Sequence, residues 1–160
     1  MIKSLTCKLK LMIKKLLSII ALGLLLSGNA NSASMISIQK YIKNNSGYLN
    51  DTTTKTYVLK RCAASYLYYA GITKDNFPKK SQLIANDYKK VLIFTGDILI
   101  DEMQWTAEVT AMSLNTDIGN MWKYYEKDGN DSFARTGDYI VGNYIGEDIL
   151  FCKEVVKNIK

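Results

Sequence analysis

The sequence contains no histidine among its 160 residues. This absence excludes catalytic sets that need a histidine base, zinc sites with histidine ligands, and di-iron helical bundles of the Glu-x-x-His type. The sequence also lacks a glycine-rich phosphate-binding loop of the Walker or Rossmann type. Carboxylates, lysines, tyrosines and two arginines therefore remain as the groups that could carry chemistry.

Proline is nearly absent as well, since Pro78 is the only one. No internal repeat and no Pro-rich or Ser-rich linker divides the chain. Residues 34–160 form a segment long enough to bury one modest core. We therefore expect a single domain over residues 34–160, preceded by a segment of different composition.

The first 33 residues have the composition of a secretory signal peptide. Residues 1–15 carry five lysines and no acid, an apolar stretch covers residues 16–26, and small and polar residues follow. We expect cleavage near residues 30–33 and export from a bacterial cell, to the periplasm or the exterior. The alternative is an uncleaved single-pass membrane anchor. It is less favoured, because a spanning helix needs about 20 apolar residues and this stretch is shorter. This segment is the only part of the chain that we expect to meet a membrane.

Removal of this segment changes the charge of the protein. The full chain has 21 basic and 15 acidic residues, and without the five N-terminal lysines 16 basic residues remain. A nucleic-acid-binding domain keeps a basic stripe after processing, and none is visible in residues 34–160. We therefore expect no nucleic-acid partner.

Processing also leaves Cys62 and Cys152 as the only cysteines, since Cys7 lies in the N-terminal segment. Two cysteines in an exported domain usually form a disulfide because the compartment is oxidising. Closing so long a loop contributes about 4 kcal/mol in the chain-entropy model. Neither cysteine lies in a C-x-x-C pair, which favours a structural disulfide over a reactive thiol or a metal ligand.

Apolar periodicity predicts an all-α fold, a small up-and-down helical bundle of about four helices closed by this disulfide. Residues 91–100 also fit a β-hairpin, but an apolar stripe that continues through Trp105 and Val109 favours a helix. Cys62 and Cys152 each lie on the apolar side of their helix, so packing of these sides brings the sulfurs together. Helices are expected over residues 35–43, about 54–70, 78–112, around 118–125 and 132–158, with a break at 113–117 and a loop at 128–131.

Carboxylates are the strongest candidates for chemistry. Asp97, Asp101 and Glu108 recur at helical spacing beside the main apolar stripe, and Asp148 lies in the apolar face of the last helix. Such a set could bind Ca²⁺ or Mg²⁺, or act as the acid and base of a hydrolase. The favoured interpretation is that the first three face water. Because a lone buried charge is costly, Asp148 is expected to pair with a lysine, an arginine or a tyrosine hydroxyl, and Arg61 is expected to form a structural ion pair.

Three other residues suggest an interaction surface. Tyr68 is expected to point away from the helix face that carries Tyr66 and Tyr69, and exposed tyrosine is common at protein interfaces. Plain packing in an aromatic-rich bundle is the favoured interpretation of these tyrosines, and an interaction surface is the alternative. Gly142 and Gly146 form a Gly-x-x-x-Gly pair, expected on the outer side of the last helix, where small residues allow close approach of another element or subunit. Chance occurrence of the two glycines is an equally favoured alternative.

The favoured hypothesis is a non-catalytic binding or interaction protein of the periplasm or cell exterior. Its partner would be an unknown protein or envelope component, or a second copy of the chain. No catalytic residue, cofactor or metal is assigned. One alternative is a divalent-cation binder or hydrolase that uses Asp97, Asp101, Glu108 and Asp148, and another is a membrane-anchored helical domain.

Overall fold

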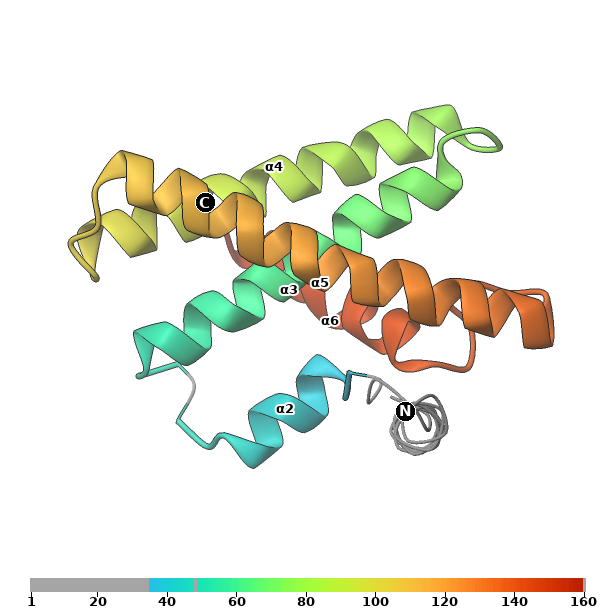
Figure 1. Ribbon diagram of the computed structural model, residues 1–160, viewed down its shortest axis with the longest axis horizontal. Coiled ribbons are helices and arrows are strands. Elements are labelled where there is room, and N and C mark those ends of the chain that lie inside the picture. The colour runs from blue at the N-terminus through green and yellow to red at the C-terminus, as the bar shows by residue number, and fades with distance from the viewer. Residues whose placement is uncertain (1–34, 48, 160) are drawn as a thin grey trace, which may run out of the picture. The chain divides into compact units, whose positions relative to one another are not determined.

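Capping side chains and one proline divide the described chain into five helices (Figure 1). The structure is a computed structural model that describes residues 35–47 and 49–159. Its helices are α2 (Ile38–Asn44), α3 (Thr52–Thr73), α4 (Pro78–Asp101), α5 (Ala107–Thr136) and α6 (Tyr144–Asn158). No strand occurs in these described ranges. The all-helical prediction is confirmed, with five helices rather than about four, and the expected signal peptide lies outside the described residues.

Each helix begins where a side chain accepts a hydrogen bond from a backbone N–H of its first turn, or where a proline removes such an N–H. Ser37, Asp51, Thr106 and Asn143 accept backbone hydrogen bonds at the starts of α2, α3, α5 and α6. Helix α4 begins with Pro78, which has no N–H to satisfy. A side-chain cap of this kind is worth about 1 kcal/mol, so these residues help to set where the helices start.

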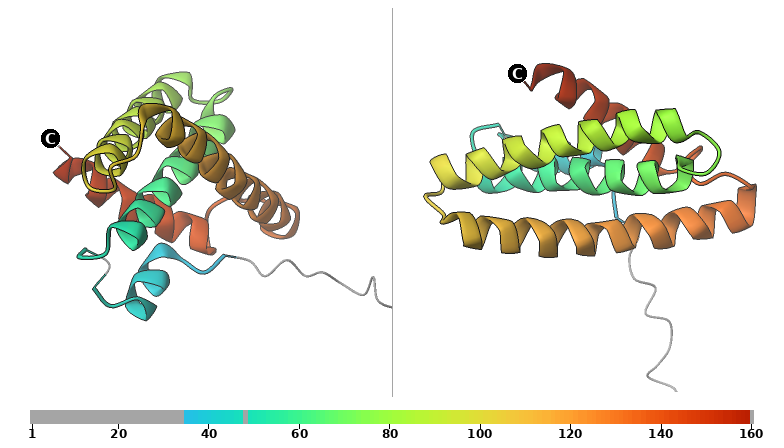
Figure 2. Two further views of the ribbon diagram at one scale, coloured as in Figure 1. Left: turned by 60° about the vertical axis from the view of Figure 1, so that its left-hand side comes forward. Right: turned by 90° about the horizontal axis from the view of Figure 1, so that it is seen from above.

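Helix α3 forms the centre of the fold. It packs against α4, α5 and α6, which surround it in Figures 1 and 2. Its buried residues include the apolar Val58 and Leu59 and also the polar Lys60, Arg61 and Ser65. A helix covered on several sides has no single apolar stripe, and its buried polar groups need partners inside the protein.

All five helices contribute to the apolar core. Ile38, Leu59, Leu99, Ile118 and Ile149 are buried members from α2, α3, α4, α5 and α6 respectively. Burial of a side chain of this size contributes about 1.5–3 kcal/mol. Helix α2 has 7 residues and is too short to be stable alone, so packing of the completely buried Ile38 helps to hold it.

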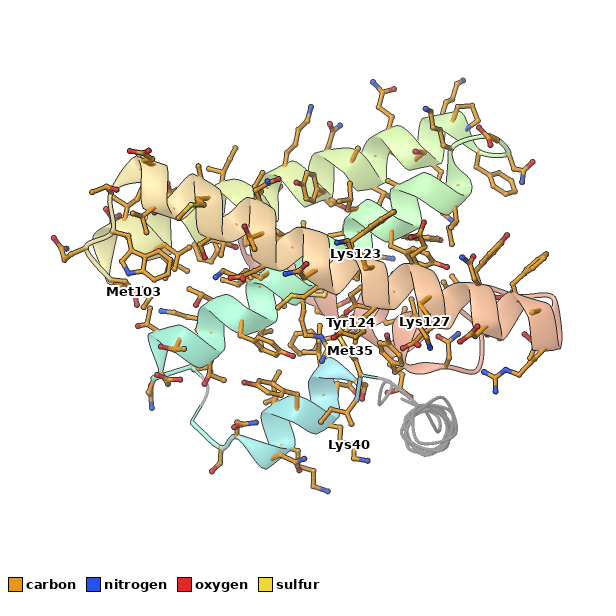
Figure 3. All side chains as sticks on the ribbon, in the orientation of Figure 1. Met35, Lys40, Met103, Lys123, Tyr124 and Lys127 are labelled. Carbon is orange, nitrogen blue, oxygen red and sulfur yellow. A yellow bond between two sulfur atoms is a disulfide. The ribbon has the colours of Figure 1, made fainter. Side chains whose placement is uncertain are left out.

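Residues 102–106 separate α4 from α5 where the apolar pattern predicts one helix. Gln104 has a positive φ of 57°, the Trp105 N–H donates to the Leu99 carbonyl (3.2 Å), and Thr106 caps α5. Met103 lies in this link, at one end of the α4–α5 pair (Figure 3). The prediction of a continuous helix over residues 78–112 is therefore wrong at this link.

Two other boundaries near this link differ from the predictions. The break expected at 113–117 is wrong, since these residues lie inside α5. The apolar pattern shifts phase there, but the helix continues. Residues 91–100 lie inside α4, so the β-hairpin alternative is wrong and the favoured helix is confirmed.

The expected loop at 128–131 also lies inside α5. A Cβ atom at Gly129 would lie 1.9 Å from the Tyr68 hydroxyl oxygen. Only glycine leaves room for the Tyr68 ring at this point of α5. Residue types that usually mark a turn therefore occur here because two helices approach closely.

The real break in this region is the loop at 137–143, inside the helix predicted for residues 132–158. Gly137 ends α5 with a φ of 75°, and the Asp138 side chain accepts hydrogen bonds from the Ile140 and Val141 N–H groups at 2.8 Å each. Asn143 then starts α6. Apolar residues that keep helical spacing across this segment concealed the break.

Candidate functional site

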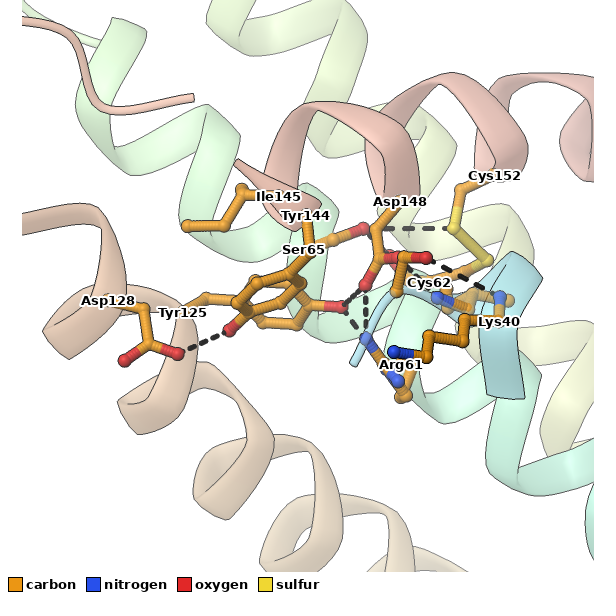
Figure 4. Close-up of polar contacts among 12 residues, drawn as sticks. Lys40, Arg61, Cys62, Ser65, Tyr125, Asp128, Tyr144, Ile145, Asp148 and Cys152 are labelled. Carbon is orange, nitrogen blue, oxygen red and sulfur yellow. Dashed lines mark hydrogen bonds and ion pairs between the residues drawn. A yellow bond between two sulfur atoms is a disulfide. The ribbon is translucent and has the colours of Figure 1, made fainter. Parts of the chain in front are cut away.

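The buried carboxylate of Asp148 forms an ion pair with Arg61 and hydrogen bonds that together connect four helices (Figure 4). The Asp148 carboxylate, on α6, accepts hydrogen bonds from the Ile38 N–H (2.6 Å), the Tyr125 hydroxyl (2.5 Å) and the Arg61 guanidinium. These three donors belong to α2, α5 and α3. The Asp148 and Arg61 side chains are 0% and 1% exposed. The predictions that Asp148 and Arg61 are paired are both confirmed.

The disulfide lies beside this ion pair (Figure 4). Cys62 and Cys152 are bonded, with their Cα atoms 5.3 Å apart, which confirms the predicted pairing. Arg61 directly precedes Cys62, and Asp148 lies one helical turn before Cys152. The same turns of α3 and α6 are therefore joined both covalently and electrostatically.

Burial and hydrogen bonding act in opposite directions on the ionisable groups of this cluster. Burial raises the pKa of Asp148, whereas the Arg61 guanidinium, the Ile38 N–H and the Tyr125 hydroxyl act to lower it. Burial also raises the pKa of Tyr125, and the nearby Asp148 adds to this effect. Arg61 remains charged at any relevant pH, so we expect it to be paired with an ionised Asp148 at neutral pH.

This cluster has the properties of a structural element. The carboxylate of Asp148 already accepts three hydrogen bonds, and the three side chains Asp148, Arg61 and Tyr125 are completely buried. A general acid or base must come within hydrogen-bond distance of a substrate. The arrangement fixes α2, α3, α5 and α6 together and gives a substrate no path to these groups.

A stack of tyrosines extends the cluster along α5. The Tyr125 ring lies 6.4 Å from Tyr68 and 5.8 Å from Tyr144, measured between centroids, and the Tyr144 hydroxyl donates to Asp128 (2.9 Å). Tyr68 is only 3% exposed, so it is not part of an exposed interaction surface, and the favoured interpretation of plain packing is confirmed. Its side of α3 is covered by α5, which lies close enough for the Tyr68 hydroxyl to meet Gly129.

The structure does not bring the candidate carboxylates together. Asp97 and Asp101 on α4 and Glu108 on α5 are exposed, whereas Asp148 is buried beside Arg61. Within residues 35–47 and 49–159, no group of three or more cysteine, aspartate or glutamate side chains could hold a metal ion. The four carboxylates therefore do not form one site.

The two candidate glycines belong to different elements but line one groove. Gly142 lies in the 137–143 loop with a φ of 77°, and Gly146 lies in the first turn of α6. The predicted pair on one helix is therefore wrong. A Cβ atom at Gly146 would lie 2.6 Å from the Ile140 carbonyl oxygen, so Gly146 allows the loop to pack against α6.

The groove itself has a volume of about 550 Å³. Tyr69 of α3 forms part of its lining, together with the two glycines and with Val141 and Leu150. Both aliphatic side chains are 67% exposed. The sequence contained the two glycines as a signal, but their common groove depends on the loop that the apolar pattern concealed.

No family model, curated protein or solved structure matches this chain. Among the helices of the described part of the chain, none combines the length and the apolar character that a membrane span requires.

Proposed function

We propose that this protein is an exported, non-catalytic binding protein that holds a partner macromolecule in the groove between the 137–143 loop and α6. The observation that carries the proposal is the pair of exposed aliphatic side chains, Val141 and Leu150, in the lining of a groove of about 550 Å³. Binding sites are typically concave and mostly apolar, with a few polar groups that set orientation.

The chemistry of the lining indicates the kind of partner. Tyr69, Ile140, Val141, Ile149 and Leu150 supply apolar surface. Gly142 has open space where a side chain would stand, so a partner's backbone can approach there. These features suit a partner protein that inserts an apolar side chain.

The polar part of the lining is small. Asn143 and Glu147 are the polar side chains in it, and Asn143 is already engaged in capping α6. The exposed Glu147 is therefore the group best placed to orient a partner, through a donor beside the inserted apolar side chain.

Two observations support export. The Cys62–Cys152 bond is typical of proteins that fold in an oxidising compartment. The N-terminal 33 residues have the basic, apolar and small-residue order of a signal peptide.

Site-specific photo-crosslinking tests the groove. A photoreactive phenylalanine analogue in place of Val141 should give a discrete crosslinked species in the producing cells. The same analogue in place of Leu49, which is 66% exposed in the α2–α3 connection, is the matched control and should give none. Leu150→Glu should remove the Val141 crosslink, because it places a charge in the apolar lining. Identical crosslinking from both positions, or none from Val141, would reject the groove as the binding site.

A further inference from the structure

The outward face of α4 carries a regular stripe of exposed side chains. Its members follow one another in steps of three and four residues, which places them on one side of a helix. All are exposed, and no described helix covers this side of α4 in Figures 1 and 2. The stripe consists of Lys79, Leu83, Asn86, Lys90, Ile93, Asp97 and Asp101.

Charge is distributed unevenly along this helix. Residues 74–90 contain five lysines and two aspartates, whereas residues 97–108 contain four carboxylates and no basic residue. A helix dipole favours acids at the N-terminus and bases at the C-terminus, so α4 carries its charges in the unfavourable order. The stability of α4 alone therefore does not explain this arrangement.

The charged members of the stripe have no internal partners. Within the described residues, the side chains of Lys79, Lys90, Asp97 and Asp101 form no ion pair. Two large aliphatic side chains lie between them, Leu83 at 67% and Ile93 at 65% exposure. Exposed apolar groups between unpaired charges of both signs are features of a contact surface.

We propose that two copies of this chain associate through this face of α4, with the two helices antiparallel about a two-fold axis. In this alignment Lys79 of one copy lies opposite Asp97 of the other, and Leu83 lies opposite Ile93. The two-fold axis repeats each contact, as in most homodimers. A parallel alignment would place lysines opposite lysines and carboxylates opposite carboxylates.

Charge complementarity selects a second copy over other partners. An anionic partner such as nucleic acid or an acidic membrane would match the basic half of the stripe and would be repelled by Asp97 and Asp101. A cationic partner would be repelled by Lys79 and Lys90. In an antiparallel pair of α4 helices, Lys79 of each copy instead lies opposite Asp97 of the other. Lys90 then lies opposite the uncharged Asn86, and Asp101 lies beyond the start of the other copy's helix at Pro78.

The dimer should be weak. Helix α4 has 24 residues, so its length is about 36 Å. A contact along one helix buries less than the roughly 1,200–2,000 Å² of a standard stable interface. Association should therefore depend on protein concentration, and it does not require the groove proposed above.

Sedimentation velocity of the oxidised protein over a concentration series tests this proposal, with circular dichroism to confirm that each variant is folded. Lys79→Asp and Asp97→Lys should each weaken self-association by about tenfold, because each places like charges opposite one another at two symmetric positions. An equimolar mixture of these two variants should associate again, because the mixed pair restores opposite charges at both positions. This recovery requires position 79 of one copy to lie close to position 97 of the other.

Leu83→Glu should abolish association. Leu150→Glu is the matched control, since Leu150 is equally exposed at 67% on α6, and it should leave association unchanged while it disables the groove. A wild-type protein that remains monomeric at every concentration would overturn the dimer proposal. Failure of the mixed variants to associate would also overturn it, and neither result would bear on the groove.

Discussion

Replacement of Asp148 by asparagine should leave Arg61 as a buried charge without a counter-ion. Breaking a buried ion pair on one side costs about 3–5 kcal/mol. Asparagine keeps an oxygen for the Ile38 N–H, which avoids a further cost of about 1–3 kcal/mol for an unsatisfied buried group. We therefore expect Asp148→Asn to lower the free energy of unfolding by about 3 kcal/mol, a large share of the about 5–15 kcal/mol that a domain usually has.

The double variant Arg61→Met with Asp148→Asn removes both charges together. Since no unpaired charge remains, the cost should be at least about 2 kcal/mol smaller than the sum of the two single costs. Urea denaturation at pH 7 without reductant, followed by tryptophan fluorescence, measures these values. Lys127→Met is the control, because the Lys127–Asp131 pair is exposed and its loss should change the free energy of unfolding little. If the costs of the two single substitutions add up to the cost of the double variant within about 0.5 kcal/mol, the reasoning is refuted.

Three other predictions concern Gly129, Asp138 and the exposed carboxylates. Gly129→Ala should lower the free energy of unfolding by about 1–3 kcal/mol, because its Cβ atom would overlap the Tyr68 hydroxyl. Gly71→Ala is the control: it has open space at a helical position and should raise the free energy of unfolding by about 0.5–1 kcal/mol. Equal effects of the two substitutions in urea denaturation would contradict the packing role of Gly129. The backbone N–H groups of Ile140 and Val141 lower the pKa of Asp138, so Asp138 stabilises the folded state above its unfolded pKa and this contribution is lost as pH falls below about 4. The stability advantage of the wild type over Asp138→Ala should therefore shrink in acid, and an advantage that grows there would contradict the assignment. Because Asp97, Asp101 and Glu108 are exposed and form no cluster, millimolar Ca²⁺ or Mg²⁺ should leave Tm unchanged, and a rise in Tm would revive the cation-binding alternative.

The predictable parts of the structure depended on side chains whose chemistry leaves few choices. Cys62 and Cys152 were expected to pair because no other cysteine remains in residues 34–160. Asp148 was expected to find a cation or hydroxyl because it interrupts an apolar helix face. The identity of two of its donors, Tyr125 and the Ile38 N–H, could not be predicted, since it depends on how α5 and α2 cross α6.

The two helix breaks that the sequence analysis missed have one physical origin. Apolar residues keep helical spacing across both real breaks, at 102–106 and 137–143, so periodicity alone joins the helices on either side. Local signals for these breaks were present in Thr106, Gly137 and Asn143, which act as caps. Gly129 had the opposite effect, because a glycine required for helix packing resembles a glycine required for a turn.

The intact mass of the protein purified from its producing cell, without reductant, is the most direct test of an exported, disulfide-closed domain. The mass should correspond to a chain that begins near residues 31–34 and is two hydrogen atoms lighter than the dithiol form, with no uptake of an alkylating reagent until a reductant is added. A mass that includes Met1, together with alkylation of both Cys62 and Cys152 in the untreated protein, would contradict this account.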